Sequence, residues 1–308
     1  IIFTDYARNW GTNSITLDSN GLNYQSRADT FTVEYGTDGM SLAITYMNAT
    51  QGWVPTIDEA VADVPSKGNQ EGIFGYGSGA SNYSLTNLVS DAGVVSSDVT
   101  GVGTARYSLE ACEYGGDKGI FGYGNGPVSM TNLVTNAGVV GTDVTGVGTA
   151  RSNLAACGYG DDKGIFGFGN DNSSEVSMTN LVSNAGVVAT DVTGVGTARD
   201  DPAGCEYGDD KGIFGFGKNV SNAKVGMTNL VSNAGVVATD VTAVGTARDN
   251  LAACSYGYDK GIFGFGNTGS VTAVTNLVSN VGVVATDVTG VGTARHLLAA
   301  TQYGGDKG

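Results

Sequence analysis

The sequence predicts an all-β protein, a five-bladed β-propeller that follows a small N-terminal β domain. A glycine-rich hexad, GIFGYG or GIFGFG, recurs five times, and each copy is followed by a T-N-L-V block and a G-T-A-R block. Glycine supplies 50 of the 308 residues, about 16% against a usual share of roughly 7%, so many tight turns are expected. The hexads begin at Gly72, Gly119, Gly164, Gly212 and Gly261.

The N-terminal residues have a different β pattern from the repeats. Short runs at 14–17, 30–35 and 41–47 are rich in β-branched and aromatic residues, and the last run leads into a Gly52-Trp53-Val54 segment. The prolines and the acidic run between Pro55 and residue 70 indicate a linker. We therefore expect a β module at 1–58, a linker at 59–70 and the propeller at 71–308.

Each repeat is expected to form four strands. In the second repeat we expect strands at 106–114, 119–124, 130–140 and 143–148, with a tight turn at 115–118. Four strands in about 47 residues match a propeller blade, whose repeat is usually ~40–50 residues. A helical solenoid is a poor fit, because no segment sustains a helical period and the Val, Thr and Gly content opposes helix.

The two ends of the array are complementary. The first hexad lacks the A-R-x-x-L-A-A strand that precedes the later ones, and residues 294–300 supply such a strand before the chain ends at Gly308. We expect residues 294–308 to pair with the strand that begins at Gly72, which would close the ring and hide its edge strands. The alternative is a longer array of which this chain is a part.

The repeat resembles known repeat families. The order R-x-x-L-A-A-x-x-Y-G-G-D-K-G-I-F-G-Y-G followed by T-N-L-V resembles a kelch repeat, although kelch units carry a Tyr and a Trp after the glycines, and here Trp10 and Trp53 lie outside the repeats. The fuller wording GDKGIFGYG…MTNLVSNAGVVATDVTGVGTAR is similar to repeat proteins of tailed bacteriophages, over residues 72–308. The D-Y-A-R-N-W and S-L-A-I-T-Y runs resemble a small β module of phage tail-fibre proteins. The resemblance implies a virion protein assembled in the cytoplasm of a bacterial host.

Catalysis is not expected. The one histidine, His296, stands where other repeats have Tyr, Ser or Asp, which is a poor position for a catalytic base. Repeated carboxylates are typical of turn and capping chemistry, whereas a catalytic pair would break the symmetry. They precede V-T at Asp98, Asp143, Asp191, Asp240 and Asp287, and Lys-Gly at Asp117, Asp162, Asp210, Asp259 and Asp306.

The other recurring residues are expected to build the scaffold. Four cysteines share one repeat position, which the fifth copy fills with Thr301, and we expect free buried thiols with neither disulfides, a metal nor a cofactor. Free thiols fit a reducing cytoplasm. The hexad glycines are expected to allow close packing of the blades, and the arginine of G-T-A-R to make structural contacts between blades. The cysteines are Cys112, Cys157, Cys205 and Cys254.

Recognition is expected where the repeats differ. The loops after the hexads vary in length and are rich in Asn, Ser and Gly, and variable loops on a rigid scaffold are where recognition usually lies. They cover residues 78–83, 125–128, 170–176, 218–225 and 267–271. The candidate ligand-binding residues are Asn82, Tyr83, Asn125, Asn170, Asn172, Asn219, Asn222 and Asn267.

These expectations combine into a phage virion component, a tail fibre or a head or tail appendage. The N-terminal module would join other virion proteins or form a homo-oligomer, a trimer for example. The propeller would bind a host cell-surface glycan non-covalently through many weak sites. Nucleic acid and membrane insertion are not expected, because the formal charge of −15 repels phosphate and Gly, Asn, Asp and Thr interrupt every apolar run. The alternatives are a secreted or surface lectin with a sugar site in each blade, and a propeller glycosidase.

Overall fold

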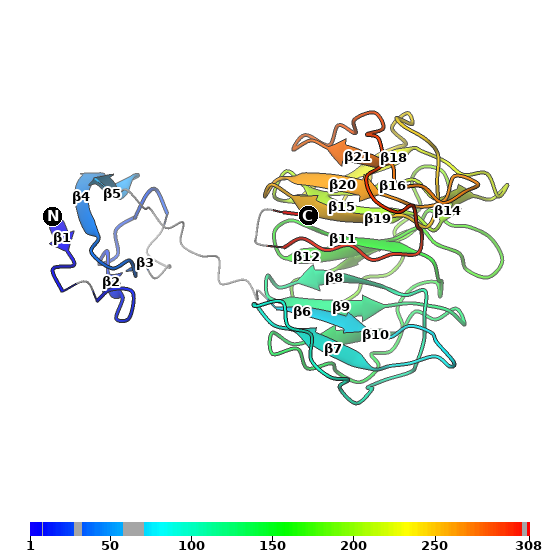
Figure 1. Ribbon diagram of the computed structural model, residues 1–308, viewed down its shortest axis with the longest axis horizontal. Coiled ribbons are helices and arrows are strands. Elements are labelled where there is room, and N and C mark those ends of the chain that lie inside the picture. Colours follow the sequence, from blue (N-terminus) through cyan, green and yellow to red (C-terminus); the bar gives the residue numbers. More distant parts are fainter. Residues whose placement is uncertain (8, 28–32, 58–70, 304–306) are drawn as a thin grey trace. The chain divides into compact units, whose positions relative to one another are not determined.

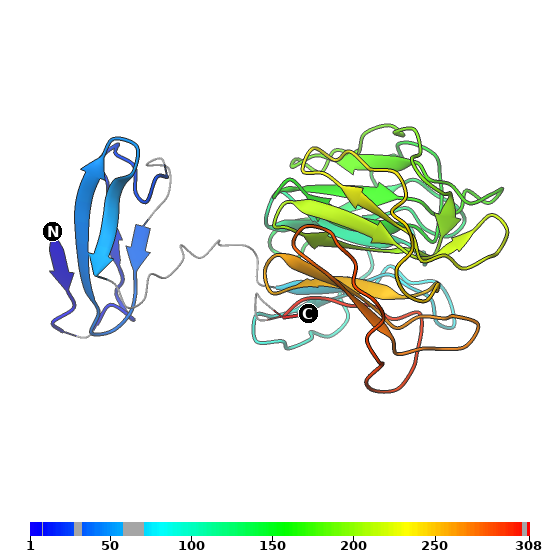
Figure 2. The same ribbon diagram turned by 90° about the horizontal axis from the view of Figure 1, so that it is seen from above.

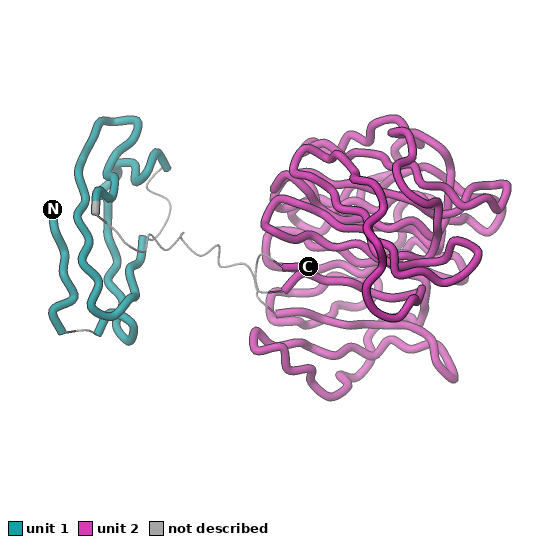
Figure 3. The backbone as a smooth tube through the Cα atoms, turned by 45° about the horizontal axis from the view of Figure 1, so that its top comes forward, with its two compact units in different colours: residues 1–68 teal, residues 69–308 magenta. Residues whose placement is uncertain are grey.

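The computed structural model describes residues 1–7, 9–27, 33–57, 71–303 and 307–308. All regular structure in these residues is β-strand or short turn, which confirms the all-β class. The chain divides into two compact units, Ile1–Gly68 and Asn69–Gly308 (Figure 3). No helix that could cross a membrane occurs in the described part of the chain.

The first unit holds two small antiparallel sheets. One has the order β1 (Ile2–Thr4), β4 (Ser41–Asn48), β5 (Gly52–Ile57), and the other pairs β2 (Ile15–Leu17) with β3 (Val33–Tyr35). The strands expected around 14–17 and 41–47 are present, whereas β1 was not predicted. Residues 28–32, which include the start of the strand expected at 30–35, lie outside the described residues. The buried core is formed by Val33, Tyr35, Met40, Leu42 and Ile44.

Pro55 lies inside β5 and not in a linker, so that part of the prediction was wrong. It stands opposite Ile44, where the register of β4 and β5 shifts between Ala43 and Ile44. A proline fits a strand at such a bulge because the ladder is already interrupted there. The remaining linker residues, 58–70, lie outside the described residues.

The second unit repeats one three-stranded antiparallel sheet (Figures 1 and 2). Its order in the second repeat is β8 (Glu110–Tyr114), β9 (Lys118–Gly122), β10 (Thr131–Val134). The later sheets are β11 (Ala155–Tyr159), β12 (Lys163–Gly167), β13 (Thr179–Val182); β15 (Ala203–Tyr207), β16 (Lys211–Gly215), β18 (Thr228–Val231); and β19 (Ala252–Tyr256), β20 (Lys260–Gly264), β21 (Thr275–Val278). The first repeat has two strands, β6 (Gly72–Gly75) and β7 (Thr86–Val89). β14 (Arg199–Asp200) pairs with β17 (Lys218–Asn219).

All four strands expected in the second repeat differ from the prediction in extent. β8 begins at Glu110 and not at residue 106. β9 ends at Gly122 because Tyr123 adopts φ 65°, a left-handed conformation that leaves the ladder. The strand expected at 130–140 stops at Val134, before a turn that contains Gly138 at φ 71°. The expected fourth strand is reduced to isolated bridges, such as that from Thr131 to Val144. The expected pairing of residues 294–308 with β6 is not among the ladders of the described residues, where β6 pairs with β7.

The hydrophobic core lies between repeats and not within them. The first strand of each sheet packs on that of the next, β8 on β11, β11 on β15 and β15 on β19. One core cluster, for example, joins Cys157 and Ile165 of the third repeat to Phe214 and Val231 of the fourth. Each sheet therefore completes its neighbour, as in other repeat architectures.

Backbone hydrogen bonds also cross the three junctions from the second to the fifth repeat, at both ends of the first strands. Where the first strand ends, the amide of Gly160 donates to the carbonyl of Asp210 at 2.8 Å. Before the first strand begins, the amide of Asp201 donates to the carbonyl of Asn153 at 2.9 Å. Because the hexad strand runs antiparallel to the first strand, its following loop returns to the end where Asn153 and Asp201 lie. The variable loops therefore share one end of the sheets.

Candidate functional site

Each variable loop of the later repeats is held by the segment that leads into its own repeat. In the third repeat, Ser152 and Asn170 exchange two backbone hydrogen bonds of 2.9 and 2.8 Å. In the fourth repeat the corresponding contact is the pairing of β14 with β17, and in the fifth the amide of Asn267 donates to Asp249 at 2.9 Å. The loops are thus anchored at a fixed position while their tips differ.

Several of the predicted ligand-binding residues shape the loops themselves. The side-chain carbonyl of Asn170 accepts the amide of Asn172 at 2.7 Å, and that of Asn267 accepts the amide of Gly269 at 2.8 Å. In the fourth loop, Asn219 accepts the amides of two residues, both at 3.0 Å. Such bonds are the Asx turns for which asparagine is favoured. Asn172 and Asn222 hold left-handed backbone conformations, with φ 75° and 58°.

The other predicted ligand-binding residues lie in the first two loops. Asn82 forms an isolated antiparallel β-bridge with Ser78 across the first loop. The ring of Tyr83 lies beside Gly79, and 38% of the Tyr83 surface is exposed. Asn125 of the second loop donates its amide to the carbonyl of Tyr107 at 2.7 Å. The structure does not gather the predicted residues into one pocket. It distributes them over successive loops at the same end of the sheets.

The sequence analysis did not predict a cluster of charged side chains that the fourth loop forms with the segments leading into the fourth and fifth repeats. The ammonium of Lys224 lies 2.6 Å from Asp249, and that of Lys218 lies 3.5 Å from Asp200 and 3.8 Å from Asp201. Asp200 and Asp249 are buried. Burial, followed by the neighbouring Asp200 carboxylate, raises the pKa of Asp201 to about 6. The available signal was that the fourth loop contains two lysines whereas the other loops contain none.

The recurring arginine forms the main polar contact between repeats. The side chain of Arg151 is fully buried, and its guanidinium lies 4.2 Å from the ring centre of Tyr123 in its own repeat. It donates to Asn180 of the next repeat at 2.6 Å and lies 3.9 Å from Asp191. Asp191 in turn accepts the hydroxyl of Thr149 at 2.7 Å. We call this set of contacts the inter-repeat clasp.

The complete clasp occurs at the first three junctions between successive repeats, and the fourth keeps the Thr–Asp hydrogen bond and the arginine stacked on a ring, without the bond from Arg248 to Asn276. These contacts confirm a structural role for the arginine. The arginines of the four junctions are Arg106, Arg151, Arg199 and Arg248, and the aspartates are Asp143, Asp191, Asp240 and Asp287. The aspartates therefore join repeats, and their assignment to local turns or caps was wrong. Burial by itself would raise the pKa of Asp191, but hydrogen bonds from Asn180 and Thr149 hold that pKa below its ordinary value. Asp98, in the first repeat, accepts from Asn87 at 2.9 Å.

The second set of repeated carboxylates does lie in turns. Asp162, for example, pairs with the adjacent Lys163 at 2.6 Å and accepts from Asn184 at 3.0 Å. Asp306 lies outside the described residues. His296 is exposed, at the repeat position that Asp200 and Asp249 occupy. Within the described residues, no group of three or more His, Cys, Asp or Glu side chains could hold a metal ion.

Glycines and cysteines complete the junctions. A Cβ on Gly122 would lie 2.7 Å from the ring of Phe166 in the next sheet, and one on Gly212 would lie 2.5 Å from Cys157 Sγ. All four cysteines are free, with Cys157 and Cys205 buried and the other two half-buried. Burial raises the pKa of the Cys157 thiol well above its ordinary value. The expected close packing and free thiols are therefore confirmed, although two thiols are less buried than predicted.

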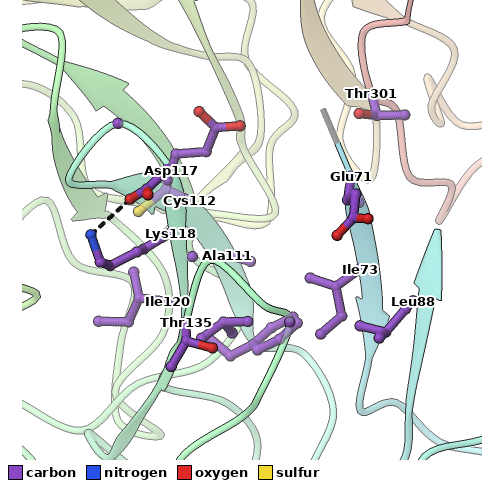
Figure 4. Close-up of a pocket in the computed structure, with 17 residues that line it drawn as sticks. Glu71, Ile73, Leu88, Ala111, Cys112, Asp117, Lys118, Ile120, Thr135 and Thr301 are labelled. Carbon is purple, nitrogen blue, oxygen red and sulfur yellow. Dashed lines mark hydrogen bonds and ion pairs between the residues drawn. The ribbon is translucent and has the colours of Figure 1, made fainter. Parts of the chain in front are cut away.

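A cavity of about 300 Å³ lies where the first repeat lacks its first strand. Glu71, Ile73 and Leu88 of the first repeat face Cys112 across it, and Thr301 also lines it (Figure 4). Comparison of the chain with protein-family models and with characterised proteins found no match.

Proposed function

We propose that this protein is a structural component of a bacteriophage virion, a tail fibre or a head or tail appendage, that binds host cell-surface glycans. In this proposal the repeats form a five-bladed kelch-like propeller. One observation carries it: the contacts between repeats recur at every internal junction, whereas the loops at one end differ in length and composition. A constant scaffold with variable loops is the arrangement that recognition proteins use.

The chemistry of the loops supports a polar ligand with many hydroxyl groups. Asn, Ser and Gly dominate the loops, and the Asx turns at Asn170, Asn219 and Asn267 hold the backbone in place before any ligand arrives. Preorganised loops lose less conformational entropy on binding. The charge of −15 disfavours contact with anionic partners and leaves neutral or cationic saccharides as the better targets.

The wording of the repeats and of residues 1–58 supports the virion assignment, through the resemblance to phage repeat and tail-fibre proteins. In the proposal, residues 1–58 attach to other virion proteins or form a homo-oligomer, a trimer for example. Several propellers on one particle would then bind a cell with high avidity even if each site is weak.

Binding of the purified chain to host polysaccharides and to intact host cells tests the proposal. Tyr83→Ala and Asn125→Ala should weaken binding, whereas Val187→Ala should not, because Val187 is exposed in a turn at the other end of the sheets. Failure to bind any host polysaccharide or cell would overturn the proposal. Five equal sugar sites per chain would favour a lectin, and release of reducing sugar would favour a glycosidase.

A further inference from the structure

The last repeat carries half of a clasp that is not engaged. Arg295 lies 4.0 Å above the ring of Phe265, as the internal arginines lie above theirs, yet it is exposed whereas those are fully buried. Among the described residues no carboxylate lies within 4.0 Å of its guanidinium, which also holds for Arg248, so exposure is what distinguishes Arg295 from the internal arginines. A Cβ on Gly292, in the segment that leads to Arg295, would have no neighbour within 4 Å, whereas one on Gly148 would lie 2.6 Å from Asn180 of the next repeat.

The first repeat carries the other half. Asn87 donates to Asp98 at 2.9 Å, which is the same acceptor arrangement that Asn132 forms with Asp143 at 2.9 Å. At the internal junction Asp143 also accepts the hydroxyl of Thr104 from the preceding repeat. No hydroxyl from another repeat reaches Asp98 within the described part of the chain. The acceptor half is therefore formed and open to a partner.

The apolar contacts at these two faces are incomplete in the same way. At the second to third junction the rings of Tyr123 and Phe166 pack edge to face at 5.2 Å, and Phe166 is fully buried. The corresponding ring of the first repeat, Phe74, is 53% exposed. On the last repeat, a Cβ on Gly264 would meet only Thr275 at 3.4 Å, whereas one on the corresponding Gly122 would lie 2.7 Å from the ring of Phe166. One face thus presents a ring without its neighbour, and the other presents the surface on which such rings pack.

The C-terminal residues already lie between these two faces. Thr301 lines the cavity that also contains Glu71 and Ile73 of the first repeat (Figure 4). A Cβ on Gly308 would lie 3.0 Å from Cys254 Sγ of the last repeat, as one on Gly261 would lie 2.7 Å from Cys205 Sγ. The last and first repeats therefore border the same seam.

We propose that the last repeat binds the first repeat of the same chain through a fifth clasp. In it Arg295 and Thr293 bind Asn87 and Asp98, and Phe74 packs against Phe265. The partner follows from continuity with the internal junctions, three of which join Arg to Asn and Asp and all four of which join Thr to Asp, and from the opposite charges of Arg295 and Asp98. Tethering within one chain favours this contact over one between two molecules, because it raises the effective concentration of the partner. The inference rests on the proposed propeller.

A double-mutant cycle on Arg295→Met and Asp98→Asn tests the fifth clasp. Each variant should unfold more readily than the wild type, and the double variant should be little worse than either single variant. The expected coupling is about tenfold in the unfolding equilibrium constant. Arg151→Met with Asp191→Asn provides the positive control at an internal clasp, and Arg295→Met with Asp191→Asn should be additive.

Two further measurements test whether Arg295 binds the first repeat of its own chain or that of another copy. Unfolding midpoints and the mass from light scattering should not change with protein concentration, and Arg295→Met should speed hydrogen exchange in residues 86–99. Additive effects of Arg295→Met and Asp98→Asn would overturn the inference, as would coupling seen only in a concentration-dependent oligomer. If Arg295→Met and Asp98→Asn show no coupling while the protein still binds glycan, the fifth clasp is rejected and the proposed function stands. If they are coupled but the protein binds no glycan, the proposed function is rejected and the fifth clasp stands.

Discussion

Arg199→Ala removes a guanidinium that is buried between the third and fourth repeats. Its terminal nitrogens donate to Asn229 at 2.6 Å and to the carbonyl of Thr197 at 3.1 Å, and one lies 3.8 Å from Asp240. The ring centre of Phe168 lies 3.9 Å from the guanidinium carbon. Burial lowers the pKa of Arg199 to about 10, so the side chain still carries its charge at neutral pH.

The expected loss of stability comes from the buried partners that Arg199→Ala leaves without a guanidinium. Removing one partner of a buried ion pair costs about 3–5 kcal/mol, because the other partner stays desolvated. Asp240 is 29% exposed and keeps its hydrogen bond from the Thr197 hydroxyl, which reduces this cost. Asn229 is fully buried and loses its donor. We therefore expect the free energy of unfolding to fall by about 3 kcal/mol.

Urea unfolding followed by circular dichroism measures this change. Repeats are coupled mainly to their neighbours, so weakening one junction should also broaden the transition. Lys163→Ala is the matched control, because it removes a charge that pairs with Asp162 at the exposed turn of the same repeat, and its midpoint should match that of the wild type. A loss below about 1 kcal/mol for Arg199→Ala, with an unchanged transition width, would refute the reasoning.

Three further predictions follow from the junctions and the buried groups. Gly122→Ala should cost about 1–3 kcal/mol because its Cβ would meet Phe166 at 2.7 Å, whereas Gly141→Ala, with 3.5 Å to its nearest neighbour, should be tolerated in the same thermal melts. Burial, helped by the nearby Glu113, raises the pKa of the half-buried Glu206 to about 7 from 4.5. The folded state therefore binds an extra proton between these values, and stability should fall as pH rises through that window. Glu206→Gln should make this fall smaller but not abolish it, because the pKa of Asp201 is also raised, to about 6. A melting temperature that drops equally in both proteins from pH 5 to pH 8 would contradict the prediction. Cys157 should react with iodoacetamide far more slowly in the native protein than in urea, as mass spectrometry of the alkylated peptides would show.

Local sequence predicted the hairpins of the repeats well. In the second repeat, the turn at 115–118 joins β8 to β9 in an antiparallel pair, as expected. The hexad strand was predicted to reach residue 124, yet Tyr123 turns out of the sheet because it adopts a left-handed conformation. All five hexads share this conformation, with φ between 62° and 65° at Tyr76, Tyr123, Phe168, Phe216 and Phe265. The ring of Tyr123 packs against Arg151 and Phe166, which lie far from it in the sequence.

The position of the variable loops could be predicted from the sequence, whereas the roles of their asparagines could not. Variation between repeats located the loops, and they do share one end of the sheets. The asparagines at 170, 219 and 267 were chosen as ligand-binding residues, and the structure shows that their carbonyls also shape the turns. Composition cannot separate these two roles, because an asparagine suits an Asx turn and a sugar hydroxyl equally well.

The sequence by itself determined that this protein is a β-rich array of five repeats with free cysteines and variable loops. These properties follow from periodicity, glycine spacing and residue type, which act over a few neighbouring residues. Only the tertiary structure decided that Asp191 binds Thr149 of the preceding repeat, 42 residues away in the chain. It also showed that Arg295 stacks on Phe265 and that Asp98 binds Asn87, as their counterparts do at the internal junctions. Which distant groups meet depends on how one sheet packs on the next, and no local pattern specifies that packing.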